Sequence, residues 1–450
     1  MSTDIRIVES TFEYEDFHYR TPIKFGGVAL DKATILNAKV TVELASGKTA
    51  TGFGSMPLAC TWSFPSKNLT YDQTLGAMKE LVTVFWETVQ ECTESGHPID
   101  LGHILEPRFL SHLKSVGEEL KLGEPIPVLA GLVAASPFDA AIHDAYGKVL
   151  GLNCFHTYGL EFLKHDLGHY LGSEFAGETL EPYVLKEPKA RMPLYHLVGA
   201  LDPLTPGDVK KPVGDGIPEH LGDWILRDGL THLKVKLNGD DLLWDVDRVI
   251  SVNLVAEEAQ HKRDIAEWWY SLDFNERCRD VEYLLEFLRQ LRAKAPAAFD
   301  RVQYIEQPTA RDLKSNRQNV MHEAAKLKPV VIDESLVDLE SLQLAREMGY
   351  TGVAFKACKG QSQTLLLAAA AQKYGLFRCV QDLTCVGPSL IHSASIAAHI
   401  PGVAAIESNG RQYCPMANEA WDSRFPGVFT IKYGTMNTSV LNGPGLGFGM

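Results

Sequence analysis

The sequence predicts an α/β protein whose larger part is a parallel (β/α)8 barrel, preceded by a smaller α+β segment. After Arg191, eight short apolar runs recur, and segments with helical spacing separate them. A chain of 450 residues has room for such a barrel, which takes roughly 200–250 residues, and for one further domain. An open, doubly wound sheet is the alternative that the same alternation allows.

The N-terminal segment begins with β-structure. The run AKVTVELASGKTATGFG alternates apolar and polar residues around the turn SGK, which predicts an antiparallel hairpin. From about Tyr71 to Leu122 the apolar spacing is helical, as in LGAMKELVTVFWETV, and PFDAAIHDAYGKVLGL continues that spacing. We therefore expect an α+β domain over residues 1–135 and a linker helix with an insertion over 136–190. The polar stretch 161–190 is interpreted as a lid, an oligomer contact or a surface insertion.

The barrel is expected over residues 191–425. Its eight strands are assigned to the runs PLYHLVG, THLKVKL, WWYSLDF, VQYIEQP, PVVIDES, GVAFKA, FRCVQDL and VAAIES. Helical segments such as VEYLLEFLRQLRAKA and LESLQLAREM lie between them, as a barrel requires. The tail, residues 426–450, resumes β alternation and is expected to fold back on the N-terminal domain.

Composition and charge exclude several classes of protein. The formal net charge is −14, which repels phosphate backbones and anionic lipid surfaces. The eight cysteines form no C-x-x-C pair, which is typical of reduced thiols in a cytosolic protein. There is no apolar run of membrane-spanning length, and the first residues lack the pattern of a secretory signal. We expect a cytoplasmic protein with no nucleic-acid or membrane partner.

Carboxylates end three successive strands of the predicted barrel. Asp273 ends the third, Glu306 the fourth and Asp333 the fifth. A buried, unpaired carboxylate costs several kcal/mol, so three of them at one end of a barrel need a shared partner. Hard oxygen ligands of this kind suit Mg2+. The alternative is that each acid caps a helix or pairs with an arginine.

Lysines mark the strands on either side. Lys234 and Lys236 lie two residues apart on the second strand and therefore share a face, and Lys356 ends the sixth strand, opposite the second. Two ammonium groups this close lower each other's proton affinity, which makes one of them a usable base. The alternative for each lysine is a solvated position at the surface.

Taken together, these motifs resemble the enolase superfamily, specifically the muconate-lactonizing-enzyme subgroup of the mandelate racemase/muconate lactonizing enzyme family. The resemblance rests on K-x-K at 234–236, D-x-N at 273–275, E-Q-P at 306–308, D-E-S at 333–335 and the strand-ending Lys356. In the N-terminal segment, RTPIKFGG is similar to the family's capping loop and FDAAIHDAYGKVLGL to the helix that leads into its barrel. The resemblance implies a TIM-type (β/α)7–8 barrel with an N-terminal α+β capping domain.

The resemblance also implies a chemistry. Asp273, Glu306 and Asp333 carry over as Mg2+ ligands, with Asn275 and Glu334 beside them. Lys236 and Lys356 carry over as the acid/base pair, with Lys234 as the electrostatic partner of Lys236. Such enzymes remove the α-proton of a small carboxylate substrate, and racemisation or epimerisation, dehydration or cycloisomerisation follows from the enolate. A homo-oligomer is expected.

Two other functions remain open. One is a catalytically silent barrel that binds a carboxylate or a partner protein. The other is a metal-dependent barrel hydrolase, which normally shows H-x-H on the first strand, where this chain has the single histidine of LYHLVG.

Several positions depart from the family's pattern. The seventh strand, FRCVQDLT, lacks the histidine base of the mandelate racemase subgroup. Dipeptide epimerases have D-x-D after the eighth strand, where this chain has Glu407, Ser408 and Asn409, so dipeptides are not expected as substrates. The loop QHKRDIAEWW, before the third strand, is expected to reach the site. The candidate substrate contacts are Lys24, His196, Asp382, Glu407 and Arg411.

Overall fold

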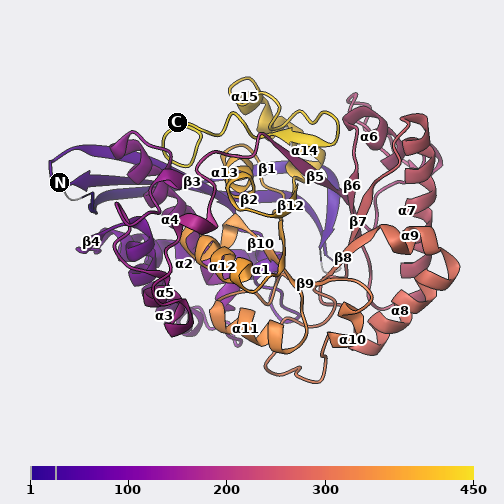
Figure 1. Ribbon diagram of the computed structural model, residues 1–450, viewed down its shortest axis with the longest axis horizontal. Helices are drawn as coiled ribbons and strands as arrows, with labels where there is room; N and C mark the ends of the chain where they lie inside the picture. The colour runs from indigo at the N-terminus through magenta and orange to yellow at the C-terminus, as the bar shows by residue number, and fades with distance from the viewer. Residues whose placement is uncertain (1–2, 26–27, 450) are drawn as a thin grey trace.

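The computed structural model describes residues 3–25 and 28–449, and it places an antiparallel sheet with its helices beside a closed barrel (Figure 1). The sheet has the strand order β3-β2-β1-β4. Its strands are β1 (Ile5–Phe25), β2 (Val28–Leu44), β3 (Thr49–Pro57) and β4 (Ser95–Gly96). The predicted hairpin is present as β2 and β3, and Gly47, with φ of 83°, makes its turn.

Four helices accompany this sheet: α1 (Cys60–Ser63), α2 (Tyr71–Gln90), α3 (Pro98–Glu119) and α4 (Val128–Leu150). Helix α4 is buried on nearly every side because it lies between the sheet and the barrel. It packs directly on the backbone of β3, since a β-carbon on Gly54 would lie 1.9 Å from the carbonyl oxygen of Pro137. On its other side, Asp139 accepts hydrogen bonds from the backbone N–H and the hydroxyl of Ser362 in the barrel (2.9 and 2.6 Å).

Eight parallel strands form the barrel, and β12 pairs with β5 to close it. All eight predicted strands are present. They are β5 (Arg191–Val198), β6 (His232–Lys236), β7 (Trp269–Asp273), β8 (Val302–Glu306), β9 (Val330–Ile332), β10 (Gly352–Phe355), β11 (Phe377–Val380) and β12 (Val403–Glu407). The open-sheet alternative is therefore wrong.

Helices surround this barrel (Figure 1). They are α6 (Leu221–Asp228), α7 (Leu242–Lys262), α8 (Val281–Lys294), α9 (Pro296–Arg301), α10 (His322–Ala325), α11 (Leu339–Glu347), α12 (Gln361–Lys373), α13 (Pro388–His399), α14 (Gly410–Tyr413) and α15 (Glu419–Asp422). Short 3-10 turns are η1 (Cys154–His156), η2 (Ser173–Phe175), η3 (Glu181–Tyr183), η4 (Pro206–Asp208), η5 (Ala357–Lys359) and η6 (Pro415–Asn418).

The predicted insertion lies outside the barrel rather than over its mouth. It contains α5 (Leu167–Leu171), and it binds the C-terminal ends of two barrel helices. Glu178 forms an ion pair with Lys373 of α12 (2.6 Å), and the N–H of Leu185 donates to the carbonyl of His399 of α13 (2.7 Å). In a parallel barrel these helix ends lie at the face opposite the strand ends that carry the candidate site, so a lid over the mouth is not what this segment forms.

One further expectation needs correction, and a second, on the tail, stays a prediction. The loop QHKRDIAEWW runs from the end of α7 into the start of β7, and therefore lies at the N-terminal face of the barrel, away from the site. The tail forms only a short strand, β13 (Thr435–Asn437), which pairs with β5 of the barrel rather than with the N-terminal sheet. Beyond β13 the tail does reach α4, because the N–H of Leu446 donates to Asp144 (3.0 Å).

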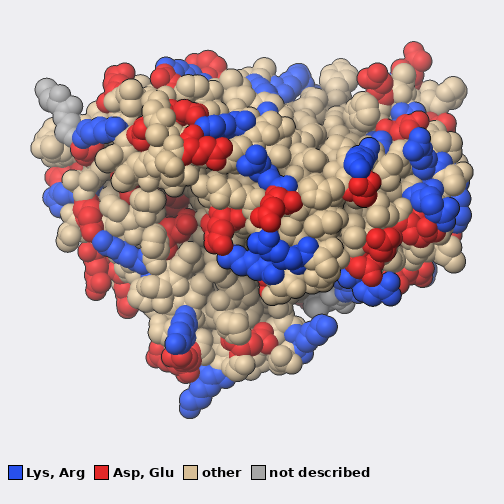
Figure 2. All heavy atoms as spheres, turned by 60° about the horizontal axis from the view of Figure 1, so that its bottom comes forward, with Lys and Arg blue, Asp and Glu red and all other residues tan. Residues whose placement is uncertain are grey.

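The division into domains stays a prediction, and the expected boundary after residue 135 falls inside α4. Across residues 3–25 and 28–449, no helix is long and apolar enough to cross a membrane. Acidic and basic side chains are intermixed on the face shown in Figure 2.

Candidate active site

The strand register places the predicted carboxylates and lysines side by side at the C-terminal end of the barrel. Lys236 of β6 lies opposite Asp273 of β7, which lies opposite Glu306 of β8. Asp333 directly follows β9, and Lys356 directly follows β10. All five side chains are buried. Parallel strands end at one edge, so the sequence alone brings these groups together.

Lys234 lies at the centre of the cluster. Its Nζ donates hydrogen bonds to Glu306 Oε1 (2.8 Å), Gln381 Oε1 (2.6 Å) and Glu407 Oε2 (3.2 Å). It is also 3.1 Å from Asp273 Oδ2. Lys234 therefore neutralises acids from three strands, which is a larger role than that of a partner to Lys236.

Lys236 donates to Asp273, and to Asn275 Oδ1 at 3.0 Å. The N–H of Asn275 donates back to Asp273 Oδ1 (2.8 Å), and its side-chain amide donates to Glu334 Oε1 (3.3 Å). Asn275 has φ of 44°, a left-handed conformation that asparagine tolerates better than most residues. The two residues predicted to lie beside the metal ligands, Asn275 and Glu334, are thus connected to each other.

On the opposite side, Lys356 Nζ is 2.8 Å from Asp333 Oδ2. Lys359 Nζ also donates to Asp333, both to the backbone carbonyl oxygen of Asp333 (2.6 Å) and to its Oδ1 (3.4 Å). Lys359 was not among the predicted site residues, although a second lysine three residues after the strand-ending Lys356 is a signal in the sequence that could have indicated it.

Trp62 covers this side of the cluster, and no signal in the sequence predicted it. Its ring centre is 4.0 Å from Lys356 Nζ, and its Nε1 donates to Glu334 Oε1 (2.9 Å). Arg311, in the loop after β8, donates to the carbonyl of Trp62 (3.1 Å) and pairs with Glu276 (2.8 Å from Nε). The α1 segment of the N-terminal domain therefore forms part of the site's cover.

The carboxylates control the proton affinity of the lysines. Burial alone would lower the pKa of Lys234, but Glu306 and Glu407 raise that pKa well above its ordinary value. Burial would likewise lower the pKa of Lys356, but Asp333 raises it by more, so this pKa also lies above its ordinary value. Lysine–lysine repulsion was expected to lower the pKa of one member of the Lys234–Lys236 pair; for Lys234 the pKa is raised instead, because nearby acids outweigh the repulsion.

The pKa values of the acids shift in different directions. Burial would raise the pKa of Asp273, but Lys236 and Lys234 hold it below its usual range. Burial raises the pKa of Glu306 well above normal, with Asp273 adding to the effect. Burial, and then Asp333, raise the pKa of Glu334 to about 7. The cluster thus has more acids than its lysines can balance in the ionised form, and the shifted pKa values reflect this.

A count of the buried groups makes the imbalance explicit. Six acids face four lysines: Asp273, Glu306, Asp333, Glu334, Asp382 and Glu407 against Lys234, Lys236, Lys356 and Lys359. With every group ionised the excess would be two negative charges, which one divalent cation balances, and the oxygen donors are the kind that Mg2+ prefers. Glu334 Oε2 is buried and has no hydrogen-bond partner among the described residues.

The donors therefore fit such an ion, although ammonium groups now occupy the spaces between them. Within the part of the chain that the structure describes, no group of three or more His, Cys, Asp or Glu side chains is arranged as a metal cage.

The residues predicted to contact the substrate lie partly inside and partly outside the lysine–carboxylate cluster. Glu407 joins the cluster through Lys234, and Asp382 lies beside it, where its carboxylate accepts from the N–H groups of Asn409 (2.9 Å) and Thr384 (3.2 Å). Burial, and then Glu407, raise the pKa of Asp382 to about 7.

His196 and Arg411 bind each other (2.5 Å) instead of facing the lysines. Arg411 also pairs with Asp228 of α6, and the His196 ring lies 5.1 Å from that of Trp224 on the same helix. Neither residue therefore lies in the lysine–carboxylate cluster. Lys24 has its backbone in β1, but its side chain lies outside the described part of the structure.

Comparisons with known proteins agree with this arrangement. Residues 217–450, more than half of the chain, match the family model described as enolase C-terminal domain-like. No curated protein matches the sequence.

Among solved structures, a muconate lactonizing enzyme from Pseudomonas fluorescens complexed with muconolactone has 17% identity and a TM-score of 0.63, covering 99% of this chain and 96% of that one. The L-Ala-D/L-Glu epimerase from Bacillus subtilis has 15% identity and a TM-score of 0.63, with 98% of each chain covered. A dipeptide epimerase from Enterococcus faecalis V583, complexed with Mg and the dipeptide L-Leu-L-Tyr, has 14% identity and a TM-score of 0.62, covering 98% and 99%. At these identities the likeness shows the fold, a barrel with an N-terminal capping domain.

Proposed function

The chain belongs to the enolase superfamily, by its match to the family of enolase C-terminal domain-like proteins, and from this premise we propose that it is a Mg2+-dependent enzyme that removes the α-proton of a small carboxylate substrate. The observation that carries the proposal is the arrangement of the strand ends. Carboxylates close β7, β8 and β9, and a lysine stands on each side, on β6 and directly after β10.

Asp273, Glu306 and Asp333 would hold the ion, whose charge when bound would stabilise the negative charge that builds up on the substrate carboxylate. The excess of acids over lysines supports this assignment, because a buried excess of two negative charges is costly unless a cation or added protons remove it.

Lys236 and Lys356 would exchange protons with the substrate from opposite sides of the α-carbon. One takes the α-proton, and the enolate that forms is protonated by the other or expels a leaving group. Return of a proton on the opposite face gives racemisation or epimerisation. Loss of water gives dehydration, and loss of an internal carboxylate opens a lactone ring, which is cycloisomerisation in reverse. Each lysine acts as a base only when its proton affinity falls, which follows from loss of its present carboxylate partner.

Dipeptides are not the substrates we propose, although the similar structures include a dipeptide epimerase and an L-Ala-D/L-Glu epimerase. The positions at the end of β12 that would bind a substrate amine already have partners within the protein. Glu407 accepts from Lys234 (3.2 Å), and Asn409 donates to Glu407 (2.7 Å). A substrate amine there would have to displace Lys234 from Glu407.

The test is exchange of the α-hydrogen for deuterium in D2O. A library of acid sugars, N-acyl amino acids, cyclic amino acids and muconate-like diacids would be screened by proton NMR, with Mg2+ and with EDTA. We expect Mg2+-dependent exchange for at least one class. Lys236→Ala and Lys356→Ala should each reduce turnover roughly 10²- to 10⁴-fold, and Lys326→Ala, on the surface, should not. Full exchange and turnover in both site variants would refute the two-lysine mechanism. Tight binding of an acid without exchange would favour the catalytically silent barrel.

A further inference from the structure

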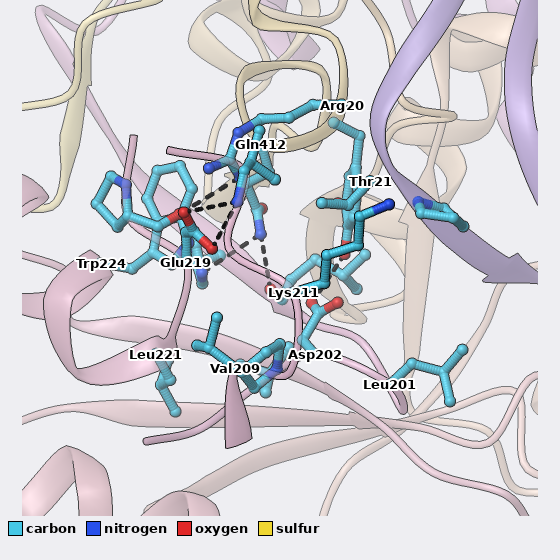
Figure 3. Close-up of a pocket in the computed structure, with 18 of the residues that line it drawn as sticks. Arg20, Thr21, Leu201, Asp202, Val209, Lys211, Glu219, Leu221, Trp224 and Gln412 are labelled. Carbon is cyan, nitrogen blue, oxygen red and sulfur yellow. Dashed lines mark hydrogen bonds between the residues drawn. The ribbon is translucent and has the colours of Figure 1, made fainter. Parts of the chain in front are cut away.

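A cavity of about 270 Å³ lies beside the lysine–carboxylate cluster and has no part in the proposed proton transfer (Figure 3). Its walls come from the end of β1, the end of β5 with the loop that follows, and the residues after β12. In Figure 3, Arg20, Gln412 and Lys211 gather in the upper part of the cavity, with Val209 and Leu221 below them. Asp202 lies beside Val209 in this lower part, so the cavity is lined by polar and apolar side chains together.

The acids around this cavity are satisfied within the protein. Asp202 accepts hydrogen bonds from the hydroxyl of Tyr413 (2.8 Å) and from the N–H of Gly199 (2.8 Å). Glu219 accepts from the backbone N–H groups of residues 213 and 214 (3.0 and 2.9 Å). Both carboxylates therefore already have hydrogen-bond donors within the protein and do not require a cationic ligand.

Arg20 is also engaged, because its Nη2 donates to Asp215 Oδ1 (2.8 Å) and to the carbonyl of Ile217 (3.0 Å). These bonds fix the end of β1 against the loop after β5, so that two separate parts of the chain hold the cavity open.

Two kinds of polar group at the cavity are not satisfied. Lys210 and Lys211 are exposed, and neither has an ion pair or a hydrogen bond to another residue that the structure describes. The second is Gln412, which is 5% exposed. Its Nε2 donates to the carbonyl of Leu197 (3.0 Å), which can only accept, so the amide orientation is fixed. Its Oε1 is then left buried without a partner in the described structure.

An orphaned buried acceptor costs free energy unless a donor reaches it, and two unpaired ammonium groups attract an acid. The volume is below the roughly 300–1,000 Å³ of a complete small-molecule pocket, so it suits one end of a ligand. The floor residue Leu197 lies directly opposite Lys234 in the β5–β6 register. Leu197 packs with Tyr413 in a small buried cluster.

We propose that this cavity binds the far end of the substrate, and that the substrate is an elongated acid. It carries a second acidic group for Lys210 and Lys211, and an N–H or O–H donor for Gln412 Oε1. The reacting carboxylate then lies near Lys236 and Lys356, several bonds away. The placement of the reacting carboxylate beside Lys236 and Lys356 rests on the proposed function. The placement of the second acidic group rests on the cavity alone.

The test compares two probes that differ only at the far end, N-glutarylglycine and its uncharged counterpart N-pentanoylglycine. Isothermal titration calorimetry with and without Mg2+ gives the ratio of their dissociation constants. We expect wild-type protein to prefer the diacid roughly 5- to 30-fold, as two partly exposed ion pairs would give. Lys210→Met/Lys211→Met should reduce this ratio to about twofold or less, without changing binding of N-pentanoylglycine.

The matched control is Lys262→Met/Lys294→Met, which removes two exposed lysines from the opposite face of the barrel. Gln412→Met should weaken both probes equally, and the ester analogue of N-glutarylglycine, which lacks the N–H, should not distinguish Gln412→Met from wild type. No diacid preference in wild type, or a preference that survives the double substitution, would overturn the far-end site. A diacid preference that is intact without Mg2+, in a protein that shows no α-hydrogen exchange, would support the cavity and count against the proposed function.

Discussion

The barrel interior has two layers that come from the same strands and differ completely in chemistry. The lower layer is a cluster of fully buried, mostly apolar residues: Tyr195, Tyr304, Val331, Ala354, Cys379 and Ala405. Two residues further along five of these strands stand Glu306, Asp333, Lys356, Gln381 and Glu407. Because strand side chains alternate, a step of two residues keeps the face and moves one layer up.

This difference shows how the fold separates stability from chemistry. The lower layer gains free energy from apolar burial, whereas the upper layer buries charges, which costs free energy unless every charge is balanced. A barrel can retain such a layer because the rest of its interior and its helices supply the stability. The two layers should therefore respond to substitution in different ways.

The largest effect should follow from emptying the lower layer. Tyr195 is fully buried, its hydroxyl donates to Gln303, and its ring lies 5.7 Å from that of Tyr304. Tyr195→Ala should lower the free energy of unfolding by about 3–5 kcal/mol, because it leaves a cavity among well-packed side chains. Urea denaturation followed by circular dichroism would measure this. A loss below about 1 kcal/mol would mean that the lower layer is not a stabilising core.

The next effect concerns Mg2+ affinity in the upper layer. Glu306→Gln should weaken Mg2+ binding by about 100-fold or more, since it removes a charged oxygen ligand, and stability without Mg2+ should not fall. Asp273→Asn and Asp333→Asn should act similarly. Calorimetric titration with MgCl2 is the measurement. Unchanged Mg2+ affinity in all three variants would mean that the carboxylates do not bind the ion. The alternative from the sequence, in which each acid caps a helix or pairs with an arginine, would then be favoured.

A pH dependence should distinguish the layers as well. The pKa of Asp382 is raised to about 7, so the folded protein holds a proton there that the unfolded chain releases near pH 4. This stabilisation is complete below about pH 4 and is lost as the pH rises through about 7. Without Mg2+, Asp382 should contribute a fall on the order of 2 kcal/mol in the free energy of unfolding between pH 5 and pH 7. Asp382→Asn should reduce the total fall by that amount and leave the part due to Glu334, whose pKa is also raised to about 7. Denaturant midpoints across pH 4–8 would measure it, and an identical slope in the variant would contradict it.

The smallest effect tests the contact between the layers. Gln381 Nε2 donates to the hydroxyl of Tyr304 (2.7 Å) and to Glu306 Oε2 (2.8 Å). Tyr304→Phe should cost about 1 kcal/mol of stability, the usual value for one buried hydrogen bond. Its Mg2+ affinity should stay within about twofold of wild type. A larger change in Mg2+ affinity would show that the lower layer positions Glu306 through Gln381.

Much of this arrangement could be predicted from the sequence. Apolar runs that end in Asp, Glu or Lys identify both the strands and the end at which their charges meet, because all parallel strands point the same way. The period of two also places Lys234 and Lys236 on one face. These signals depend only on local order along the chain.

The parts that could not be predicted depend on faces and partners. His196 lies in a strand that is buried on both sides, so alternation does not reveal which side faces the barrel, and the side turned out to be that of α6. Trp62 reaches the site from a different domain, through contacts between residues 272 positions apart. The tail pairs with β5 instead of the N-terminal sheet, a choice between two edges that three β-residues do not encode.

Under the proposed function, Trp62 would also set the population of the state that can react. Under the proposed function, the indole must leave Lys356 before a substrate reaches it, which breaks the hydrogen bond to Glu334 and the contact with the ammonium group. Together these interactions are worth roughly 1.5–4 kcal/mol, so only about 0.1–10% of molecules would be open at any moment. Apparent substrate affinity is reduced by that fraction. A substrate that itself donates a hydrogen bond to Glu334 and contacts the Lys356 ammonium group would lose less apparent affinity. Displacement of Trp62 would therefore favour some acids over others.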